Sequence, residues 1–304
     1  MMTMICRGLV LSWAMAGCFV APPPPPCTVG WNPPQRLAEL ASDADEDGPW
    51  LSADRRHVMF SSNRDGAIGV YEAARTDAAA PFDPPTAVAE LVVDLASPPD
   101  SYPVIEDPEP FMTEDLRQVY IGRRIRNGDR DIAVASRANA GAKFGTPSPA
   151  AFDTSSNDAG VDSSNNDMDP TFSPDLMTIY FASDRRTGQY RLYAATATSP
   201  GLGWGDAVLI DATPTLSSLD RAPAIGPDGT MLLFESDRLG GRTVFESDRI
   251  GPGLTDFGPP VAFQPLDGEL AGAPYITSDG TALIYSADHG DGQGRDLYVM
   301  EHCD

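Results

Sequence analysis

A short segment recurs five times along the chain, each time beginning at a proline. Successive prolines lie 51 to 61 residues apart. An aspartate follows each proline after five residues, and an aliphatic or aromatic residue follows after eleven. The five prolines are Pro49, Pro110, Pro170, Pro223 and Pro274. A constant internal register over five copies is typical of repeat architectures, so we expect five similar units packed side by side.

Every copy contains two apolar stretches of three or four residues, which are too short for helices and rich in β-formers. The first stretches are residues 57–60, 118–121, 178–181, 231–234 and 282–285. The second stretches are residues 68–71, 132–134, 191–193, 243–245 and 296–299. Asp-Gly pairs at residues 228–229 and 279–280 predict tight hairpin turns. No window of the repeat region has a sustained helical period, so almost no helix is expected.

A further piece of each unit is an aromatic residue followed three positions later by proline, just before another short strand. It occurs at Phe82, Phe144 and Phe257, in weaker form at Trp204, and once before the first copy, at Trp31. The last copy lacks this piece, so we expect residues 30–48 to complete the last unit and close a ring. Four short antiparallel strands in each of five units predict an all-β fold, a five-bladed β-propeller, with six blades the less favoured count.

The repeat also resembles that of a known family. A proline-to-aspartate segment, a Phe-x-Ser-x-Arg segment such as residues 234–238, and the Asp-Leu-Tyr-Val of residues 296–299 follow one another. This order is similar to the WD-like repeats of TolB-type propellers, over about residues 30–304, although the second copy, with Asp115-Leu116, departs from it. The resemblance implies a non-catalytic binding platform in the bacterial envelope. TolB proteins carry an additional α/β domain before the propeller, for which residues 1–29 leave no room, so we expect a propeller alone.

The first 18 residues have the layout of an export signal. Arg7 precedes an apolar run over residues 8–16, which is too short to span the roughly 30 Å of a bilayer core. Residues 15–18, Met-Ala-Gly-Cys, resemble a bacterial lipobox, which implies a lipid on Cys18; an ordinary secretory signal is the alternative. We therefore divide the chain into a lipoprotein signal peptide (1–17), a lipidated cysteine with a stiff proline-rich linker (18–29) and the propeller domain (30–304).

This division predicts a protein anchored in the bacterial cell envelope, on the periplasmic side of the outer membrane or at the cell surface. Two cysteines remain for the folded part, Cys27 and Cys303, one at each of its ends. Disulfides persist in exported proteins, so we expect one bond between these cysteines at the seam of the ring. Two unpaired thiols are the alternative.

The charge balance disfavours several classes of partner. The 304 residues hold 44 acidic and 21 basic side chains, a net charge of −23, and Lys143 is the only lysine. Binding to nucleic acid or to anionic lipid depends on clustered Lys and Arg. No nucleic-acid partner is therefore expected, and the lipid anchor is the only membrane contact predicted.

Two groups of acidic residues are candidate sites. Acids just before the repeat prolines could form a collar at the mouth of a central channel and hold a cation or a basic peptide tail; solvated turn acids are the alternative. The collar residues are Asp47, Asp107, Asp167 and Asp220. The second group matches the start of a calcium loop, with alternating carboxylates before a glycine, although its usual glutamate is absent. Its residues are Asp43, Asp45, Asp47 and Asp54.

Other recurring charges have structural interpretations. The aspartate after each repeat proline is interpreted as a turn cap. An arginine fifteen residues after the proline, at Arg64, Arg185 and Arg238, is interpreted as an ion-pair partner. No nucleophile elbow, phosphate loop or His-Glu-x-x-His motif occurs.

The sequence thus predicts a monomeric non-enzyme that binds an envelope protein, a peptide or a glycan, with no cofactor unless calcium binds. One alternative is a carbohydrate-active hydrolase or lyase with central carboxylates about 5–10 Å apart in a deep pocket. Another alternative is a calcium-stabilised surface adhesin.

Overall fold

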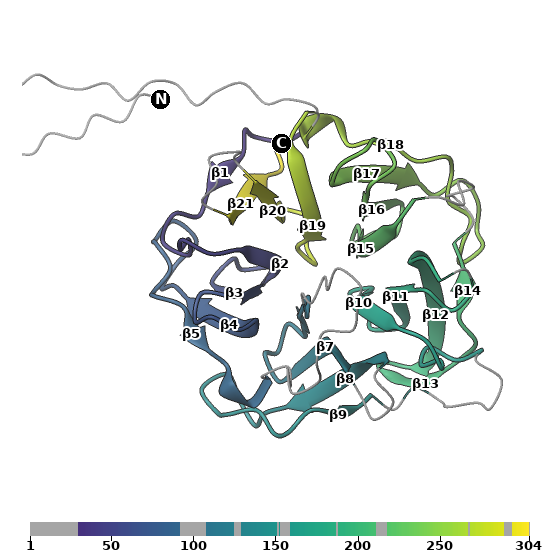
Figure 1. Ribbon diagram of the computed structural model, residues 1–304, viewed down its shortest axis with the longest axis horizontal. Helices are drawn as coiled ribbons and strands as arrows, with labels where there is room; N and C mark the ends of the chain where they lie inside the picture. The colour runs from purple at the N-terminus through teal and green to yellow at the C-terminus, as the bar shows by residue number, and fades with distance from the viewer. Residues whose placement is uncertain are drawn as a thin grey trace, which may run out of the picture.

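The computed structural model describes residues 30–91, 108–124, 129–150, 152, 159–186, 188–210, 218–266, 268–288 and 294–303. These residues form five antiparallel sheets and two single-turn 3-10 helices, η1 (Ala89–Leu91) and η2 (Gln264–Leu266). The sheets follow one another around a central axis as the blades of a propeller (Figure 1). The five-bladed fold expected from the repeat is therefore confirmed. Within the described residues, no helix has the length and apolar composition to cross a membrane.

Each blade runs from an inner strand at the axis to a short outer strand. The first blade consists of β2 (Glu46–Leu51), β3 (His57–Ser62), β4 (Gly69–Ala74) and β5 (Thr86–Ala87). The second consists of β6 (Phe111–Met112), β7 (Gln118–Arg124), β8 (Arg130–Ser136) and β9 (Ser148–Pro149). The third consists of β10 (Asp167–Phe172), β11 (Thr178–Ser183), β12 (Arg191–Ser199), β13 (Leu202–Trp204) and β14 (Val208–Leu209). The fourth consists of β15 (Asp220–Ile225), β16 (Met231–Ser236), β17 (Thr243–Asp248) and β18 (Val261–Ala262).

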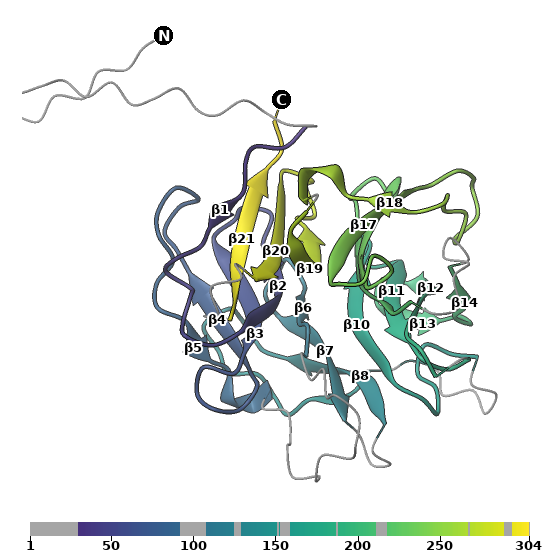
Figure 2. The same ribbon diagram turned by 45° about the horizontal axis from the view of Figure 1, so that its top comes forward.

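The fifth blade joins the two ends of the folded chain. It consists of β19 (Leu270–Ile276), β20 (Ala282–Asp288), β21 (Arg295–Glu301) and, from the other end of the sequence, β1 (Gln35–Arg36). β1 pairs antiparallel with β21, with Gln35 opposite Val299, and the two strands lie side by side in Figures 1 and 2. The N-terminal segment therefore completes the last blade, as the missing aromatic-proline piece predicted.

The aspartate after each repeat proline caps the turn between the first two strands of its blade. In the third blade, Asp175 accepts hydrogen bonds from the Ser173 hydroxyl (2.6 Å) and the Met177 amide (3.0 Å). Asp54, Asp115 and Asp279 make the same pair of bonds, and Asp228 bonds instead to the amide and hydroxyl of Thr230. These capped turns explain why the aspartate recurs in all five copies.

A buried ion pair recurs in three blades and uses the arginine fifteen residues after the proline. Arg185 lies 2.7 Å from Asp167, and Arg238 lies 2.6 Å from Asp220. In the first blade, Arg64 lies 3.0 Å from Glu46. Each guanidinium also lies over two aromatic rings of its own blade, 4.6–5.2 Å from their centroids. The expected ion-pair role of these arginines is confirmed, and each pair holds an inner strand against its neighbours.

The residue before each repeat proline has a left-handed backbone. Its φ is 54° at Gly48 and Asp169, 23° at Glu109, 48° at Ala222 and 44° at Ala273. The inner strands β2, β10, β15 and β19 shift register at this point, as expected for a bulge, which redirects side chains. A left-handed backbone costs a non-glycine residue about 1 kcal/mol or more, so the surrounding blades must hold it in place.

Candidate functional site

A cavity lies at the axis, at the end of the ring that carries the capped turns. Its volume is about 250 Å³. We call it the axial pocket. Its lining comes from the inner strands of four blades and the turns that follow them, and includes Phe111, Glu114, Phe172, Ile225, Tyr275 and Ser278.

Aromatic rings form much of the wall of the axial pocket, and carboxylates lie at its rim. The ring centroid of Phe111 is 4.8 Å from that of Phe172 and 6.3 Å from that of Tyr275. At the rim, Glu114 accepts hydrogen bonds from the Ser278 hydroxyl (2.7 Å) and the Ala53 amide (3.1 Å), which fix its position. An apolar pocket with an anionic rim is suited to an apolar stem that carries a positive charge.

A chain of alternating charges lies beside the axis and connects the fourth blade to the first. Asp47 is 2.6 Å from Arg242, Arg242 is 2.6 Å from Glu235, and Glu235 is 2.8 Å from Arg221. Burial opposes ionisation of Asp47, but Arg242 and Arg295 hold its pKa well below the usual range. A side chain at Gly272 would collide with Arg242 and Glu235, so the fifth blade, which has no acid there, leaves room for the chain of charges.

Two other carboxyl groups at the axis form no ion pair with any of the described residues. Glu109 and Asp169 line a small space of about 20 Å³, bounded by the five repeat prolines, which we call the axial chamber. Oε1 of Glu109 and Oδ1 of Asp169 are buried without a hydrogen-bond partner. Burial, reinforced by the charge of Asp169, raises the pKa of Glu109 well above its usual value. Burial, only partly offset by Arg221, raises the pKa of Asp169 to about 6.

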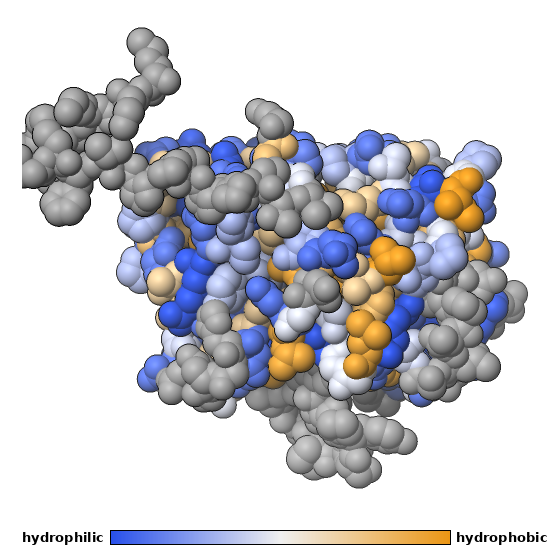
Figure 3. Space-filling view, turned by 90° about the horizontal axis from the view of Figure 1, so that it is seen from above, coloured by the Kyte–Doolittle hydropathy of each residue, from blue (hydrophilic) through white to orange (hydrophobic). Residues whose placement is uncertain are grey.

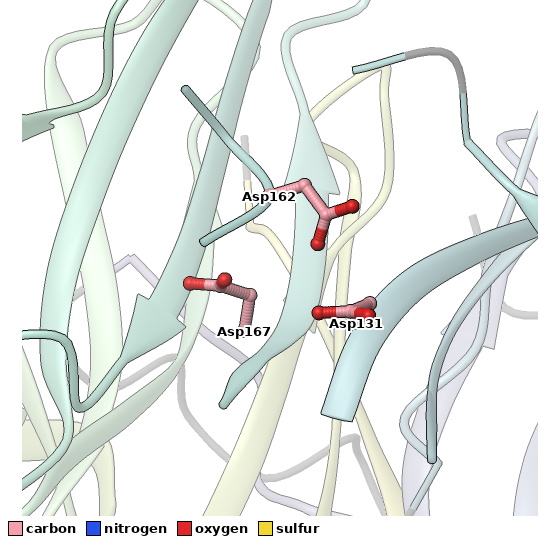
Figure 4. Close-up of side chains that lie close together, drawn as sticks. All are labelled: Asp131, Asp162 and Asp167. Atoms are coloured by element: carbon pink, nitrogen blue, oxygen red, sulfur yellow. The ribbon is translucent and has the colours of Figure 1, made fainter. Parts of the chain in front are cut away.

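A third acidic group lies between the second and third blades. Oxygen atoms of Asp131, Asp162 and Asp167 lie within 4.8 Å of one another, and Figure 4 shows the three side chains close together. Burial and the adjacent Asp162 carboxyl raise the pKa of Asp131 to about 8. Asp167 accepts hydrogen bonds from Arg185 and Ser163, whereas one oxygen each of Asp131 and Asp162 has no partner. These are the carboxylates within the described residues that could hold a divalent cation.

The predicted collar residues do not line an open channel. Asp167 and Asp220 have equivalent positions, opposite Ser183 and Ser236, but in the first blade Glu46, not Asp47, holds that position, opposite Ser62. Asp47, Asp167 and Asp220 are buried, and each forms an ion pair with an arginine. Asp107 lies outside the described residues. The carboxylates that do face the axis are Glu109 and Asp169, because the left-handed backbone before the proline directs them there.

The predicted calcium-loop residues are dispersed. Asp43 is exposed, and Asp45 accepts a hydrogen bond from the Arg295 amide at 3.0 Å. Both oxygens of Asp47 are close to guanidinium groups, and Asp54 caps a turn beyond the opposite end of β2. The structure therefore does not bring these four carboxylates together.

The predicted cysteine sites cannot be placed in full. Cys18 and Cys27 lie outside the described residues, so lipidation and the Cys27–Cys303 bond stay predictions. The Cys303 amide donates to the Gly30 carbonyl (2.8 Å), which puts Cys303 beside the start of the described chain.

Sequence reasoning did not single out Glu109 as a site residue. A signal was present, because the residue before the repeat proline is acidic in the second and third copies and glycine or alanine in the others. Asp131 gave no such signal, since it becomes a neighbour of Asp162 and Asp167 only when two blades pack together.

Exposed apolar residues are dispersed on the outside of the ring. The large ones are Leu202, Val208, Leu239, Ile250, Val261 and Leu270. Figure 3 shows one side of the molecule, on which hydrophobic residues occur in small separate groups among hydrophilic ones. Single exposed apolar residues are a normal feature of protein surfaces.

No protein-family model and no curated protein matches the chain. Solved structures do match. The endo-arabinase from Bacteroides thetaiotaomicron is 14% identical, with a TM-score of 0.55, and the match covers 88% of this chain and 96% of that one. A thermostable family-43 glycoside hydrolase is 14% identical, with a TM-score of 0.54, over 86% and 90% of the two chains.

TolB from Acinetobacter baumannii is also among the matches. It is 14% identical, with a TM-score of 0.48, over 88% of this chain and 56% of its own length. This chain thus spans little more than half the length of that TolB. At such identities these likenesses show the fold alone, which is that of a β-propeller.

Proposed function

We propose that this chain is an extracytoplasmic, lipid-anchored propeller that binds an envelope protein or peptide in the axial pocket and catalyses no reaction. The observation that carries the proposal is the axial pocket itself. Ligand sites are typically concave and mostly apolar, with a few placed polar groups, and this pocket has aromatic walls below an acidic rim. Its volume of about 250 Å³ suits one or two side chains of a peptide. The acidic rim favours a basic peptide over a neutral glycan.

A carbohydrate-active hydrolase is the second candidate. Glu109 and Asp169 have raised pKa values at the axis, and two of the matched structures are named as glycoside-active enzymes. A glycosidase must place a sugar between its two carboxyl groups. The axial chamber holds about 20 Å³, which is the space of a single water molecule, so its dimensions favour binding over hydrolysis.

Assays of the full chain on arabinan and on aryl arabinofuranosides separate the two candidates. We expect no turnover above that of a heat-denatured sample. Turnover that disappears in Glu109→Gln would overturn the binding proposal and select the hydrolase.

The binding role is tested with a photo-crosslinking residue in place of Ser278, which lines the axial pocket, in the full chain expressed in its native host. The control places the same residue at Ser136, at the exposed end of β8. A covalent adduct with one envelope protein is expected from position 278 and not from position 136. Equal adducts from both positions, or none from position 278, would contradict the proposal.

The anchor is tested separately. Labelled palmitate should be incorporated into the wild-type chain and not into Cys18→Ser; labelling that persists in the variant would refute lipidation at this residue. Mass spectrometry of peptides from the unreduced protein should recover Cys27 linked to Cys303.

A further inference from the structure

We infer that the axial pocket and the axial chamber form one site for a primary ammonium group carried by a peptide, an inference that rests on the proposed binding function. The ammonium lies in the chamber between Glu109 and Asp169, and its carbon stem lies in the pocket. Either a lysine side chain or a peptide amino terminus supplies this chemistry.

The first argument is the distribution of charge around the axis. In the chain Asp47–Arg242–Glu235–Arg221, each carboxylate is matched by a guanidinium. Glu109 and Asp169 lie outside this chain, and within the described residues neither forms an ion pair. Both are more than nine-tenths buried, with exposures of 8% and 2%. Burying a carboxylate without a partner is energetically unfavourable. A single positive charge placed between Glu109 and Asp169 would remove much of this penalty.

The second argument is the size and position of the chamber. Oε1 of Glu109 and Oδ1 of Asp169 are unpartnered, and both residues line this space of about 20 Å³. An ammonium group is about as large as a water molecule and donates three hydrogen bonds. Asp169 already accepts one bond, from the Ala222 amide at 3.2 Å, through its other oxygen. A guanidinium is too wide for this space, so the chamber selects lysine or an amino terminus over arginine.

The third argument is the route by which such a group enters. Phe111, Thr171 and Tyr275 line both the pocket and the chamber, so the two spaces adjoin. Aromatic faces attract cations and accept methylene groups, and Glu114 at the rim attracts positive charge. The chain cannot fill the site with its own lysine, because Lys143 is exposed on the outside of the ring and pairs with Glu90 at 3.3 Å.

The test uses the full chain, with three tripeptide amides as probes. Acetyl-Ala-Lys-Ala-amide is compared with the same peptide in which norleucine replaces lysine, and with Ala-Ala-Ala-amide, whose amino terminus is free. Isothermal titration and thermal shift measure binding. We expect the lysine peptide, the free-amine peptide or both to raise the melting temperature with concentration, and the norleucine peptide to bind at least tenfold more weakly.

The double variant Glu109→Gln/Asp169→Asn should bind the ammonium probe at least tenfold more weakly while remaining folded. Its control, Glu246→Gln/Asp248→Asn, removes the same charge from β17, away from the axis, and should bind like the wild type. Equal loss in both double variants would show a general charge effect and overturn the inference. Calcium or potassium chloride that displaces the peptide at millimolar concentration would also overturn it, by assigning the chamber to a metal ion.

Failure of this inference is distinguishable from failure of the proposed function. If the lysine and norleucine peptides bind equally and Ser278→Trp, which fills the pocket, abolishes both, the ammonium site is refuted and the pocket remains a binding site. If the axial variants bind the lysine peptide as the wild type does, the chamber has no part in recognition.

Discussion

Two sets of buried carboxyl groups in this ring differ in whether they form an ion pair with an arginine. Glu46, Asp167 and Asp220 each meet an arginine of their own blade, which also packs on two aromatic rings. Glu109 and Asp169 lie near the charge of Arg221, but within the described residues neither forms an ion pair, and each retains an oxygen without a hydrogen-bond partner. The first set recurs from blade to blade, whereas the second occurs in only two blades. We therefore interpret the carboxylate–arginine pairs that recur in several blades as structural. We interpret the two axial carboxyl groups, which do not recur, as part of a binding site.

The largest effect is expected from breaking one of the repeated ion pairs. Arg185→Met should lower the free energy of unfolding by about 3–5 kcal/mol, because Asp167 would stay buried without its cation. Chemical denaturation measures the change. Arg186→Met, at an exposed neighbouring position, should alter the stability by less than about 0.5 kcal/mol. Asp167→Asn in the Arg185→Met background should recover part of the loss; no recovery would show that packing of the arginine, not its charge, matters.

At the axis, by contrast, a substitution is expected to stabilise the protein. Asp169→Asn should raise the free energy of unfolding at pH 7 by about 1–3 kcal/mol, because it removes a buried charge that has no ion pair. The folded pKa of Asp169, about 6, exceeds that of an unfolded aspartate, so the native state binds more protons between these values. Stability of the wild type should therefore fall as the pH rises from about 4 to 6.

Denaturation curves across this pH window measure the contribution, which should disappear in Asp169→Asn. Asp248→Asn, on the exposed end of β17, is the control and should leave the profile unchanged. A variant less stable than the wild type at pH 7 would mean that Asp169 has a stabilising partner after all.

The smallest effect is expected at the cluster of three carboxylates. The pKa of Asp131 is raised to about 8, so its contribution to stability should decline as the pH rises toward 8. Asp131→Asn should raise the melting temperature at pH 8 by less than Asp169→Asn does, because Asp131 is partly exposed and water screens its charge. Calcium chloride that raises the wild-type melting temperature, but not that of the variant, would identify a cation site here.

Much of the ring could be predicted because each blade repeats the same local chemistry. The constant spacing within each copy predicted the turn aspartates, the paired arginines and the missing fourth piece of the last copy. The structure confirms each of these predictions. The roles of the axial carboxyl groups were harder to predict, because they depend on whether another blade places a guanidinium beside each carboxyl group. Asp47 was expected to face a channel, but Arg242 of the fourth blade reaches it, a contact between residues 195 positions apart. Spacing within a copy carries no information about such contacts.

The pairing of β1 with β21 also imposes an order on folding. Gln35 is synthesised long before its partner Val299. Four blades can assemble from neighbouring segments, whereas the fifth must wait with three strands until both ends of the chain meet. Until then β21 has an open edge, and a β1 segment from a second copy could occupy it. The rate at which β1 pairs with β21 of its own chain therefore decides between a closed monomeric ring and a strand-swapped dimer.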